Sequence, residues 1–173
     1  MIQLYKNVLE DDLVKGLLDY YQHNLDRLTD YGNFEQVEID AGHKLSTLMK
    51  DLTHKIGDDY FERHDKMSMA PKVYAVEGFR IKRYQPNEGN FPWHVDAGTI
   101  QNCTRFLAFL YYLNDNDAGT KFEKAYIPAE KGSVVVFPPM WMYPHEGEMP
   151  KEKPKFIMST YFHFLGVDSR LQS

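Results

Sequence analysis

Residues Arg105–Leu113 form the run RFLAFLYYL, in which nearly every side chain is apolar or aromatic. A short apolar run bounded by turn residues is typical of a buried strand, and Tyr and Phe favour strands. Ser133–Phe137 (SVVVF) is a second run of this kind, between Lys131-Gly132 and Pro138-Pro139, and Phe156–Phe164 is a third. After the first run, Asn114 to Gly119 (NDNDAG) predicts a turn. The C-terminal half is therefore expected to be built of strands.

The first third of the chain has helical periodicity instead. Apolar residues between Leu9 and Leu28 recur at the spacing of one helix face, and Asp11 and Asp12 lie in the first turn, where the helix dipole favours acids. A second helix is predicted over Ala41–His64. We expect its buried stripe to consist of Leu45, Leu48, Met49, Leu52 and Ile56.

Helices followed by many antiparallel-looking strands indicate an α+β domain, mainly β, built on a β-sandwich or a jelly roll. Pro71 is expected to end the helical part, and Lys72–Tyr84 is expected to begin the strands. A length of 173 residues fits one domain. We predict helical support over about residues 1–70 and the sheet core over about residues 71–166.

Composition narrows the classes of function. The formal net charge is −5 and the pI is about 5.8, with no basic stripe of the kind that grips nucleic acid. No apolar run approaches the ~18 residues needed to cross a bilayer, and the N-terminus lacks the apolar core of a signal peptide. The single cysteine, Cys103, excludes an internal disulfide framework. We expect a cytoplasmic protein that binds neither nucleic acid nor membrane.

The segment Trp93-His94-Val95-Asp96 places an imidazole and a carboxylate two positions apart. Residues i and i+2 of a strand point to the same side, so both side chains could face one metal. Two histidines and one carboxylate on one face suit non-haem Fe(II) oxygenases. With 7 His and 25 acidic residues in the chain, about one His-x-Asp/Glu is expected by chance, and the chain contains one. The pair alone therefore carries no weight.

The residues around the His94 and Asp96 pair are stronger evidence for a metal site. The turn-rich segment from Gln85 to Asn90 precedes His94. His145 lies just past SVVVF and a Pro-rich turn, where a neighbouring strand could return it to the first two residues. Lys155 follows ten residues later, at the start of the last long strand, and could pair with a carboxylate inside a barrel. The alternative is a solvated lysine in the run from Lys151.

Residues Phe79–Phe164, about half of the chain, resemble the prolyl 4-hydroxylase-like branch of the 2-oxoglutarate/Fe(II)-dependent dioxygenases. Several motifs stand in the order typical of that branch, and His145 and Lys155 fall at the spacing of its distal histidine and its basic anchor. The motifs are Arg83-Tyr84 with Gly89, Trp93, His94 and Asp96; Arg105 with Tyr111 to Asn114; Gly119 to Phe122; and Pro128, Lys131 to Ser133 and Phe137. The resemblance implies a double-stranded β-helix, or jelly roll, with N-terminal supporting helices.

The same resemblance implies a role for individual residues. His94, Asp96 and His145 would hold Fe(II) and form the catalytic centre. Lys155 would pair with the far carboxylate of 2-oxoglutarate, with the hydroxyls of Tyr84 and Tyr112 as helpers. The cofactors implied are Fe(II), 2-oxoglutarate as cosubstrate and O2, with ascorbate as an accessory reductant.

The sequence departs from the pattern at a few positions. Ala118 replaces the first Gly of a usual pair, and Lys121 and Tyr161 stand where an acid and a Trp are frequent. Arg105 is a substrate-contact position in some relatives, although strict strand alternation places it on the face opposite Tyr112 unless the strand bulges.

The bulky segment from Met140 to Tyr143 precedes His145 and has two interpretations. Its Trp141 either walls the substrate entrance or belongs to the core.

The function expected from the resemblance is hydroxylation of an unactivated C–H bond, with succinate and CO2 as coproducts. The first candidate substrate is a prolyl or other side chain in a peptide or protein. Alternatives are a free amino acid or other small molecule, and a non-catalytic cupin-like module that binds metal or ligand. A buried cation at Lys155 separates an oxygenase from a plain metal-binding barrel.

Overall fold

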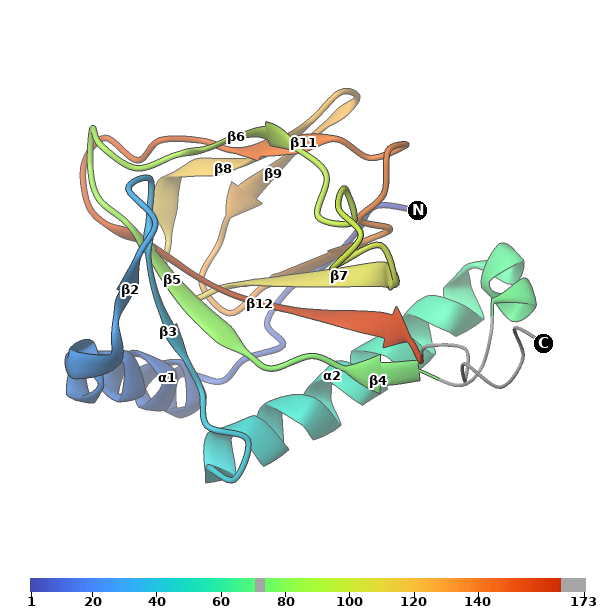
Figure 1. The fold of residues 1–173 in the computed structure, drawn as a ribbon, viewed down its shortest axis with the longest axis horizontal. Helices are drawn as coiled ribbons and strands as arrows, with labels where there is room; N and C mark the ends of the chain where they lie inside the picture. The colour runs from blue at the N-terminus through green and yellow to red at the C-terminus, as the bar shows by residue number, and fades with distance from the viewer. Residues whose placement is uncertain (71–73, 166–173) are drawn as a thin grey trace.

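Two antiparallel sheets face one another in the computed structural model, which describes residues 1–70 and 74–165 (Figure 1). The larger sheet has the order β1-β10-β7-β12-β5-β3-β2, with β4 also paired to β12, and the smaller one has the order β6-β11-β8-β9. The strands are β1 Gln3–Tyr5, β2 Thr29–Asp30, β3 Glu35–Glu38, β4 Tyr74–Val76, β5 Arg80–Tyr84, β6 Phe91–His94, β7 Arg105–Tyr112, β8 Asn116–Phe122, β9 Ala125–Ala129, β10 Val134–Phe137, β11 His145–Gly147 and β12 Lys155–Phe164.

Two helices, α1 (Asp11–His23) and α2 (Lys44–Arg63), cover the outer face of the larger sheet (Figure 1). Short 3-10 helices, Leu25–Arg27 and Asp65–Met69, follow them. Both helices lie within the predicted ranges, so the α+β, mainly β, architecture is confirmed. None of the described helices is long and apolar enough to cross a membrane.

The buried stripe of α2 differs from the prediction at one position. Leu48 is 53% exposed, because it lies on the side of the helix that does not face the sheet. The residues buried on that side are Leu45, Met49, Thr53, Ile56, Gly57 and Tyr60. Gly57 lets α2 approach the sheet closely, since a Cβ there would lie 2.5 Å from the Phe162 ring.

The position of β7 explains why nearly every residue of RFLAFLYYL is apolar. Phe109 and Tyr111 point outward into the core beneath the helices, whereas Ala108, Leu110 and Tyr112 point inward between the sheets. Strand β12 alternates in the same way. Because both faces of the larger sheet are covered, its central strands cannot show the apolar-polar alternation of a half-exposed strand.

The first 70 residues are less helical than expected. Three short strands, β1, β2 and β3, extend the larger sheet, and the sequence analysis predicts none of them. Polar residues such as Glu35 and Gln36 give β3 no strand-like apolar pattern. In the fold, β1 pairs with β10, β3 pairs with β5, and β2 pairs with β3. Strand β8 begins at Asn116, inside the predicted turn. The predictions at Pro71, at Lys72 and at residue 166 lie outside the described residues.

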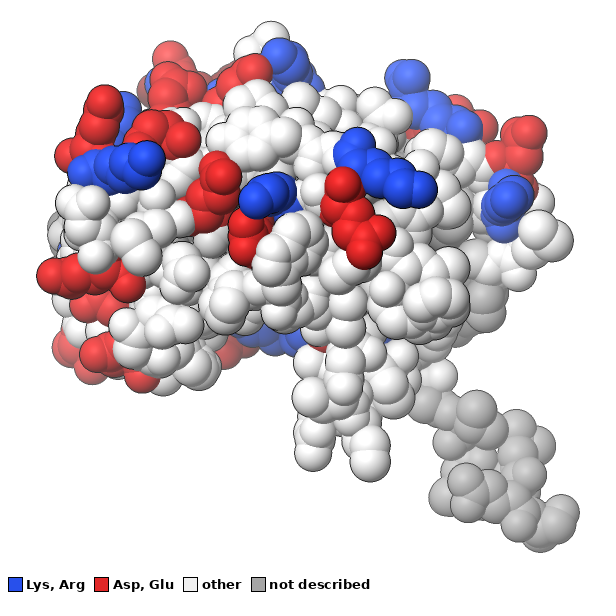
Figure 2. Space-filling model, turned by 90° about the horizontal axis from the view of Figure 1, so that it is seen from above, with Lys and Arg blue, Asp and Glu red and all other residues white. Residues whose placement is uncertain are grey.

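The face of the molecule seen from above the smaller sheet carries charges of both signs. Figure 2 shows acidic and basic side chains interspersed there, with large uncharged areas between them. That face therefore has no uniformly basic surface.

Candidate metal and cosubstrate site

His94, Asp96 and His145 converge between the two sheets. His94 ends β6 and His145 begins β11, and the two residues are paired directly across these neighbouring strands. Asp96 lies in the turn after β6, two residues beyond the end of the strand on which we expected it. Their ligand atoms lie within 4.8 Å of one another. The His94 Nε2 to Asp96 Oδ1 distance is 3.4 Å, and the His145 Nε2 to Asp96 Oδ2 distance is 3.5 Å.

Backbone carbonyls orient both imidazoles. The Nδ1 atom of His94 lies 2.8 Å from the Pro92 carbonyl, and Nδ1 of His145 lies 3.2 Å from the Tyr143 carbonyl. A proton held on Nδ1 by a carbonyl leaves the Nε2 lone pair available. Burial lowers the pKa of His145, which favours the neutral imidazole that a metal requires.

Asp96 supplies the test of whether these residues fit a metal ion. Its Oδ1 accepts a hydrogen bond from the Tyr161 hydroxyl at 3.0 Å, whereas its Oδ2 is buried and has no hydrogen-bond partner among the described residues. Burial raises the pKa of Asp96, but the neighbouring His94, His145 and Lys82 lower it, and the net value is about 2. A buried, ionised oxygen without a partner is costly, and a bound cation would satisfy it. The donor set therefore fits Fe(II).

Lys155 lies in the same narrow cavity as the triad and is only 2% exposed. Its Nζ donates one hydrogen bond, to the Glu148 carbonyl at 2.6 Å, and lies 4.9 Å from the centre of the Tyr84 ring. Burial lowers the pKa of Lys155 to about 8. The interpretation of Lys155 as a solvated lysine is therefore wrong. An ammonium has three donors, so this one retains capacity for an anion.

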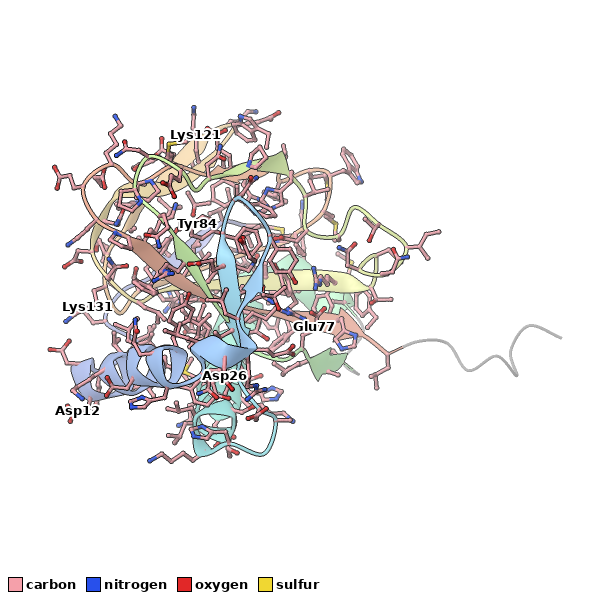
Figure 3. All side chains as sticks on the ribbon, turned by 60° about the vertical axis from the view of Figure 1, so that its left-hand side comes forward. Asp12, Asp26, Glu77, Tyr84, Lys121 and Lys131 are labelled. Atoms are coloured by element: carbon pink, nitrogen blue, oxygen red, sulfur yellow. The ribbon has the colours of Figure 1, made fainter. Side chains whose placement is uncertain are left out.

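The two tyrosines proposed as helpers occupy different places. Tyr84 lines the cavity, opposite Lys155 in the pairing of β5 with β12, and Figure 3 shows it between the sheets while Asp12, Lys121 and Lys131 lie at the periphery. The Tyr112 hydroxyl donates to Thr120 Oγ1 at 2.7 Å. Thr120 lines the cavity and Tyr112 does not, so Tyr112 would act through Thr120.

Arg105 reaches the site because β7 and β12 pair irregularly between Phe162 and His163. This irregularity returns Arg105 to the inner face, which strict alternation would deny it. Its guanidinium lies 3.9 Å from the centre of the Tyr161 ring and donates to both carboxylate oxygens of Glu77, at 2.7 and 2.8 Å, and to the Asp96 carbonyl at 3.2 Å.

Trp141 does not belong to the core. It is 78% exposed and Met142 is 51% exposed, so the core interpretation of this segment is wrong. Pro139, the residue before this segment, accepts a hydrogen bond at 2.9 Å from the N–H of Ala97, the residue after Asp96.

Lys82 is a charged residue of this site to which the sequence pattern assigned no role. It lines the cavity together with the triad and Lys155, and burial lowers its pKa to about 8. Strand alternation could have found it, because Lys82 lies two positions before Tyr84 on the same strand.

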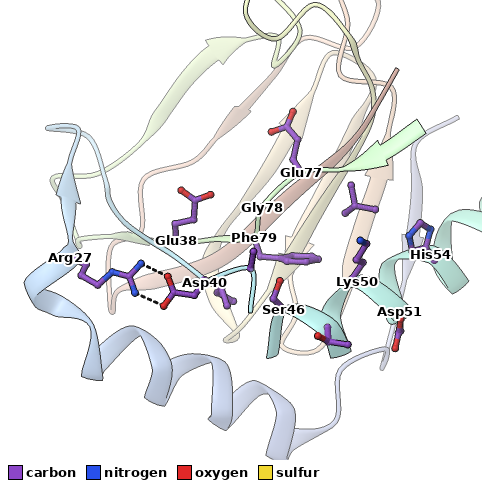
Figure 4. Close-up of a pocket in the computed structure, with 14 residues that line it drawn as sticks. Arg27, Glu38, Asp40, Ser46, Lys50, Asp51, His54, Glu77, Gly78 and Phe79 are labelled. Atoms are coloured by element: carbon purple, nitrogen blue, oxygen red, sulfur yellow. Dashed lines mark hydrogen bonds and ion pairs between the residues drawn. The ribbon is translucent and has the colours of Figure 1, made fainter. Parts of the chain in front are cut away.

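A larger groove on the helical side has a different character. It has a volume of about 730 Å³ and lies between α2 and the segments around Glu38 and Gly78 (Figure 4). A pair of hydrogen bonds joins Arg27 to Asp40 at one end, at 2.6 and 2.7 Å. None of the triad residues lines this groove, so it is separate from the metal site.

Residues 79–163 match the family model described as the 2OG-Fe(II) oxygenase superfamily. This segment, about half of the chain, belongs to that superfamily. The protein is a 2-oxoglutarate-dependent dioxygenase, a class whose cofactors are Fe(II), 2-oxoglutarate and O2. The matched segment runs from just before β5 almost to the end of β12 and includes His94, Asp96, His145 and Lys155.

Solved structures of prolyl hydroxylases share this oxygenase's fold. The viral collagen prolyl hydroxylase of Paramecium bursaria Chlorella virus-1, in complex with 2OG, has a TM-score of 0.74 and 19% identity over 95% of this chain and 96% of its own. A Pseudomonas putida prolyl-4-hydroxylase has a TM-score of 0.76 and 15% identity over 95% and 93%. A Trichoplax adhaerens prolyl hydroxylase, in complex with a hypoxia-inducible factor peptide, has a TM-score of 0.72 and 11% identity over 94% and 83%. No curated protein sequence matches the chain. The jelly-roll fold, with its supporting helices, is thus confirmed.

Proposed function

We propose that this oxygenase hydroxylates an unactivated C–H bond of a prolyl or other side chain in a peptide or protein, with succinate and CO2 as coproducts. The observation that carries the proposal is that the His94, Asp96 and His145 triad and the buried ammonium of Lys155 line one narrow cavity. A metal site that did not use a dicarboxylate would not need to bury that cation.

The chain's own residues divide the work. His94, Asp96 and His145 would hold Fe(II), and Tyr161 fixes the Asp96 carboxylate through Oδ1. Lys155 would bind the distal carboxylate of 2-oxoglutarate by a charge-assisted hydrogen bond. Iron and 2-oxoglutarate together supply an oxidant able to attack an unreactive C–H bond, and the protein positions the reactants. Ascorbate as an accessory reductant stays a prediction.

A peptide or protein substrate is supported by apolar side chains around the metal ligands. Trp93 is 47% exposed, Ile100 is 90% exposed and Trp141 is 78% exposed. Each lies within five residues of a proposed ligand in the sequence. Exposed aromatic and aliphatic side chains gathered near a site are typical of protein-binding surfaces. The structural neighbours include a collagen prolyl hydroxylase and a prolyl hydroxylase bound to a peptide fragment, which agrees with this choice.

The alternative functions differ in how well they are supported. A non-catalytic cupin-like module loses its support once the chain is placed among the oxygenases. A small-molecule substrate, such as a free amino acid, is an outcome of the test below. The cytoplasmic location and the lack of a nucleic-acid or membrane partner stay predictions.

The test is a screen of substrate-dependent oxidation. The iron-loaded enzyme is incubated with 2-oxoglutarate, air and libraries of proline-containing peptides, and mass spectrometry follows the gain of one oxygen atom. We expect oxidation of a peptide with matching release of succinate. Oxidation of free amino acids with none of any peptide would contradict the choice of substrate and leave the oxygenase class intact.

A further inference from the structure

A second cavity, of about 350 Å³, opens beside the metal ligands on the side away from Lys155. His94, Asp96, Lys82 and Tyr161 line both this cavity and the narrow one that contains Lys155, so the two cavities meet at two of the three proposed metal ligands, His94 and Asp96. We call it the outer cavity. If Lys155 binds 2-oxoglutarate on one side of the iron, the outer cavity is the space left for the substrate.

Three cations line the outer cavity. Arg80 and Lys82 come from alternate positions of β5, and Arg105 begins β7. Glu77 joins the two guanidiniums, because it accepts hydrogen bonds from Arg80 at 2.9 Å and from Arg105 at 2.7 and 2.8 Å. The guanidiniums are thus held in place by one carboxylate.

Lys82 is held by aromatic faces alone. Its Nζ lies 5.1 Å from the centre of the Phe34 ring and 5.6 Å from that of Phe91. Within residues 1–70 and 74–165 no hydrogen bond and no ion pair to the Lys82 ammonium is found. Burial lowers the pKa of Lys82 and the negative charge of Asp96 raises it, with a net value of about 8.

The charges of the loaded site leave this cation without a counter-ion. A ferrous ion and Lys155 would balance the Asp96 carboxylate and the two carboxylates of 2-oxoglutarate. Glu77 neutralises one of the two guanidiniums. Lys82 and the second guanidinium remain in excess, in a cavity lined in part by the rings of Tyr31, Phe34, Phe91 and Tyr161.

We propose that the substrate of this enzyme carries a carboxylate close to the carbon that is oxidised, and that Lys82, supported by Arg80 and Arg105, binds this carboxylate in the outer cavity. The proposal rests on the proposed function. Lys82 and Lys155 are then two anchors for two different anions on either side of the iron. Their surroundings agree with separate roles, because the carboxylate that raises the pKa of Lys82 is Asp96, whereas those that raise the pKa of Lys155 are Glu148 and Asp117.

A carboxylate next to a prolyl ring can come from two sources. It is either the α-carboxylate of a terminal or free residue, or the side chain of a neighbouring Asp or Glu. Both would form a charge-assisted hydrogen bond with the Lys82 ammonium. The test therefore contains a probe for each source and a neutral amide matched to each.

The test measures binding without turnover. Iron-loaded protein saturated with 2-oxoglutarate is kept free of oxygen, and the lysine Cε–Nζ resonances are followed by NMR, with Lys82 assigned from Lys82→Arg. The probes for the α-carboxylate are N-acetylproline and N-acetylprolinamide. The probes for the side-chain carboxylate are N-acetyl-aspartyl-prolinamide and N-acetyl-asparaginyl-prolinamide.

We expect at least one carboxylate probe to shift the Lys82 resonance and to bind at least tenfold more tightly than its amide, since a hydrogen bond to a charged group is lost with the charge. Lys82→Met should abolish this preference while the affinity for 2-oxoglutarate stays within about twofold of wild type. The control variant Lys121→Met, on the exposed face of β8, should change neither quantity.

Two results would overturn the proposal. One is a Lys82 resonance that responds to neither carboxylate probe at millimolar concentrations. The other is a Lys82→Met variant that loses affinity for 2-oxoglutarate instead of discrimination between acid and amide, which would make Lys82 a cosubstrate anchor. Failure of the proposed function has a different signature, namely the absence of 2-oxoglutarate-dependent oxidation of any peptide, and is scored in the separate screen.

Discussion

The two faces of the larger sheet do different work, although the same strands build both. On its outer face, β12 places Met158 and Phe162 in the apolar core beneath the helices. On its inner face, the same strand places Lys155 and Tyr161 in the cavity with the triad. The outer face is closed by apolar packing. The inner face instead buries the Lys155 cation opposite the smaller sheet, where Asp96 Oδ2 has no hydrogen-bond partner within the described part of the chain.

This difference teaches where stability and chemistry are located. Burial of apolar side chains supplies folding free energy. Buried charges consume it unless they are paired. Substitutions on the outer face should therefore change the free energy of unfolding, and those on the inner face should change the affinity for metal and cosubstrate.

The largest effect on activity is expected from His145→Ala, at the metal site between the two sheets. The variant should lose 2-oxoglutarate decarboxylation to below detection, because one of three ligands is removed, yet keep its circular dichroism spectrum. His163→Ala is the matched control, since His163 lies at the far end of β12 from Lys155 and outside the cavity, and should retain activity. Iron-dependent turnover retained in His145→Ala would contradict the triad.

The next effect belongs to the outer face. Phe162→Ala should lower the free energy of unfolding by roughly 3–5 kcal/mol, the usual range for a buried Phe, because the ring is fully buried and packs on Phe109 and against α2 at Gly57. Urea unfolding measures the change. The neighbouring inner-face variant Tyr161→Phe should cost much less, and equal costs would remove the contrast between the faces.

A smaller effect is expected from Lys155→Ala. The 2-oxoglutarate concentration needed for half-maximal turnover should rise at least tenfold, since a hydrogen bond to a charged group contributes about 1.5–3 kcal/mol. Lys153→Ala, an exposed lysine two residues earlier, is the control. An unchanged requirement for 2-oxoglutarate in Lys155→Ala would remove this residue from the site.

The smallest expected effect is that of pH on the affinity for 2-oxoglutarate near neutrality. Because burial lowers the pKa of Lys155 to about 8, the ammonium is charged below that pH and neutral above it. The dissociation constant for 2-oxoglutarate should be flat below pH 7 and rise about tenfold by pH 9. Lys155→Arg, which keeps its charge over this range, should flatten the profile, and an equally steep rise in that variant would assign the titration to another group.

Local pattern was enough to predict part of this molecule. The helices and the strands β7, β10 and β12 follow from periodicity and apolar runs, and the order of motifs identified the residues that converge as a triad. Strands such as β3 could not be predicted, since their polar residues become strands only by pairing with a distant segment.

The inner face was harder to predict than the triad. The position of Arg105 depends on an irregular pairing that no local pattern encodes. Lys82 resembles any other charged residue of the segment RIKRY until the fold turns its side chain toward the metal ligands. The fold likewise turns the Lys155 ammonium toward the metal ligands and buries it.

The central claim is that His94, Asp96 and His145 hold iron between the two sheets, with 2-oxoglutarate anchored by Lys155 on the inner face of the larger sheet, and it has a direct spectroscopic test. Fe(II) is added to the protein without oxygen, followed by 2-oxoglutarate, and the visible absorption spectrum is recorded. A weak metal-to-ligand charge-transfer band should appear in the wild type, be missing in His145→Ala, and need at least tenfold more 2-oxoglutarate in Lys155→Ala. Folded wild-type protein that contains one iron per chain by metal analysis and shows no band would contradict the account.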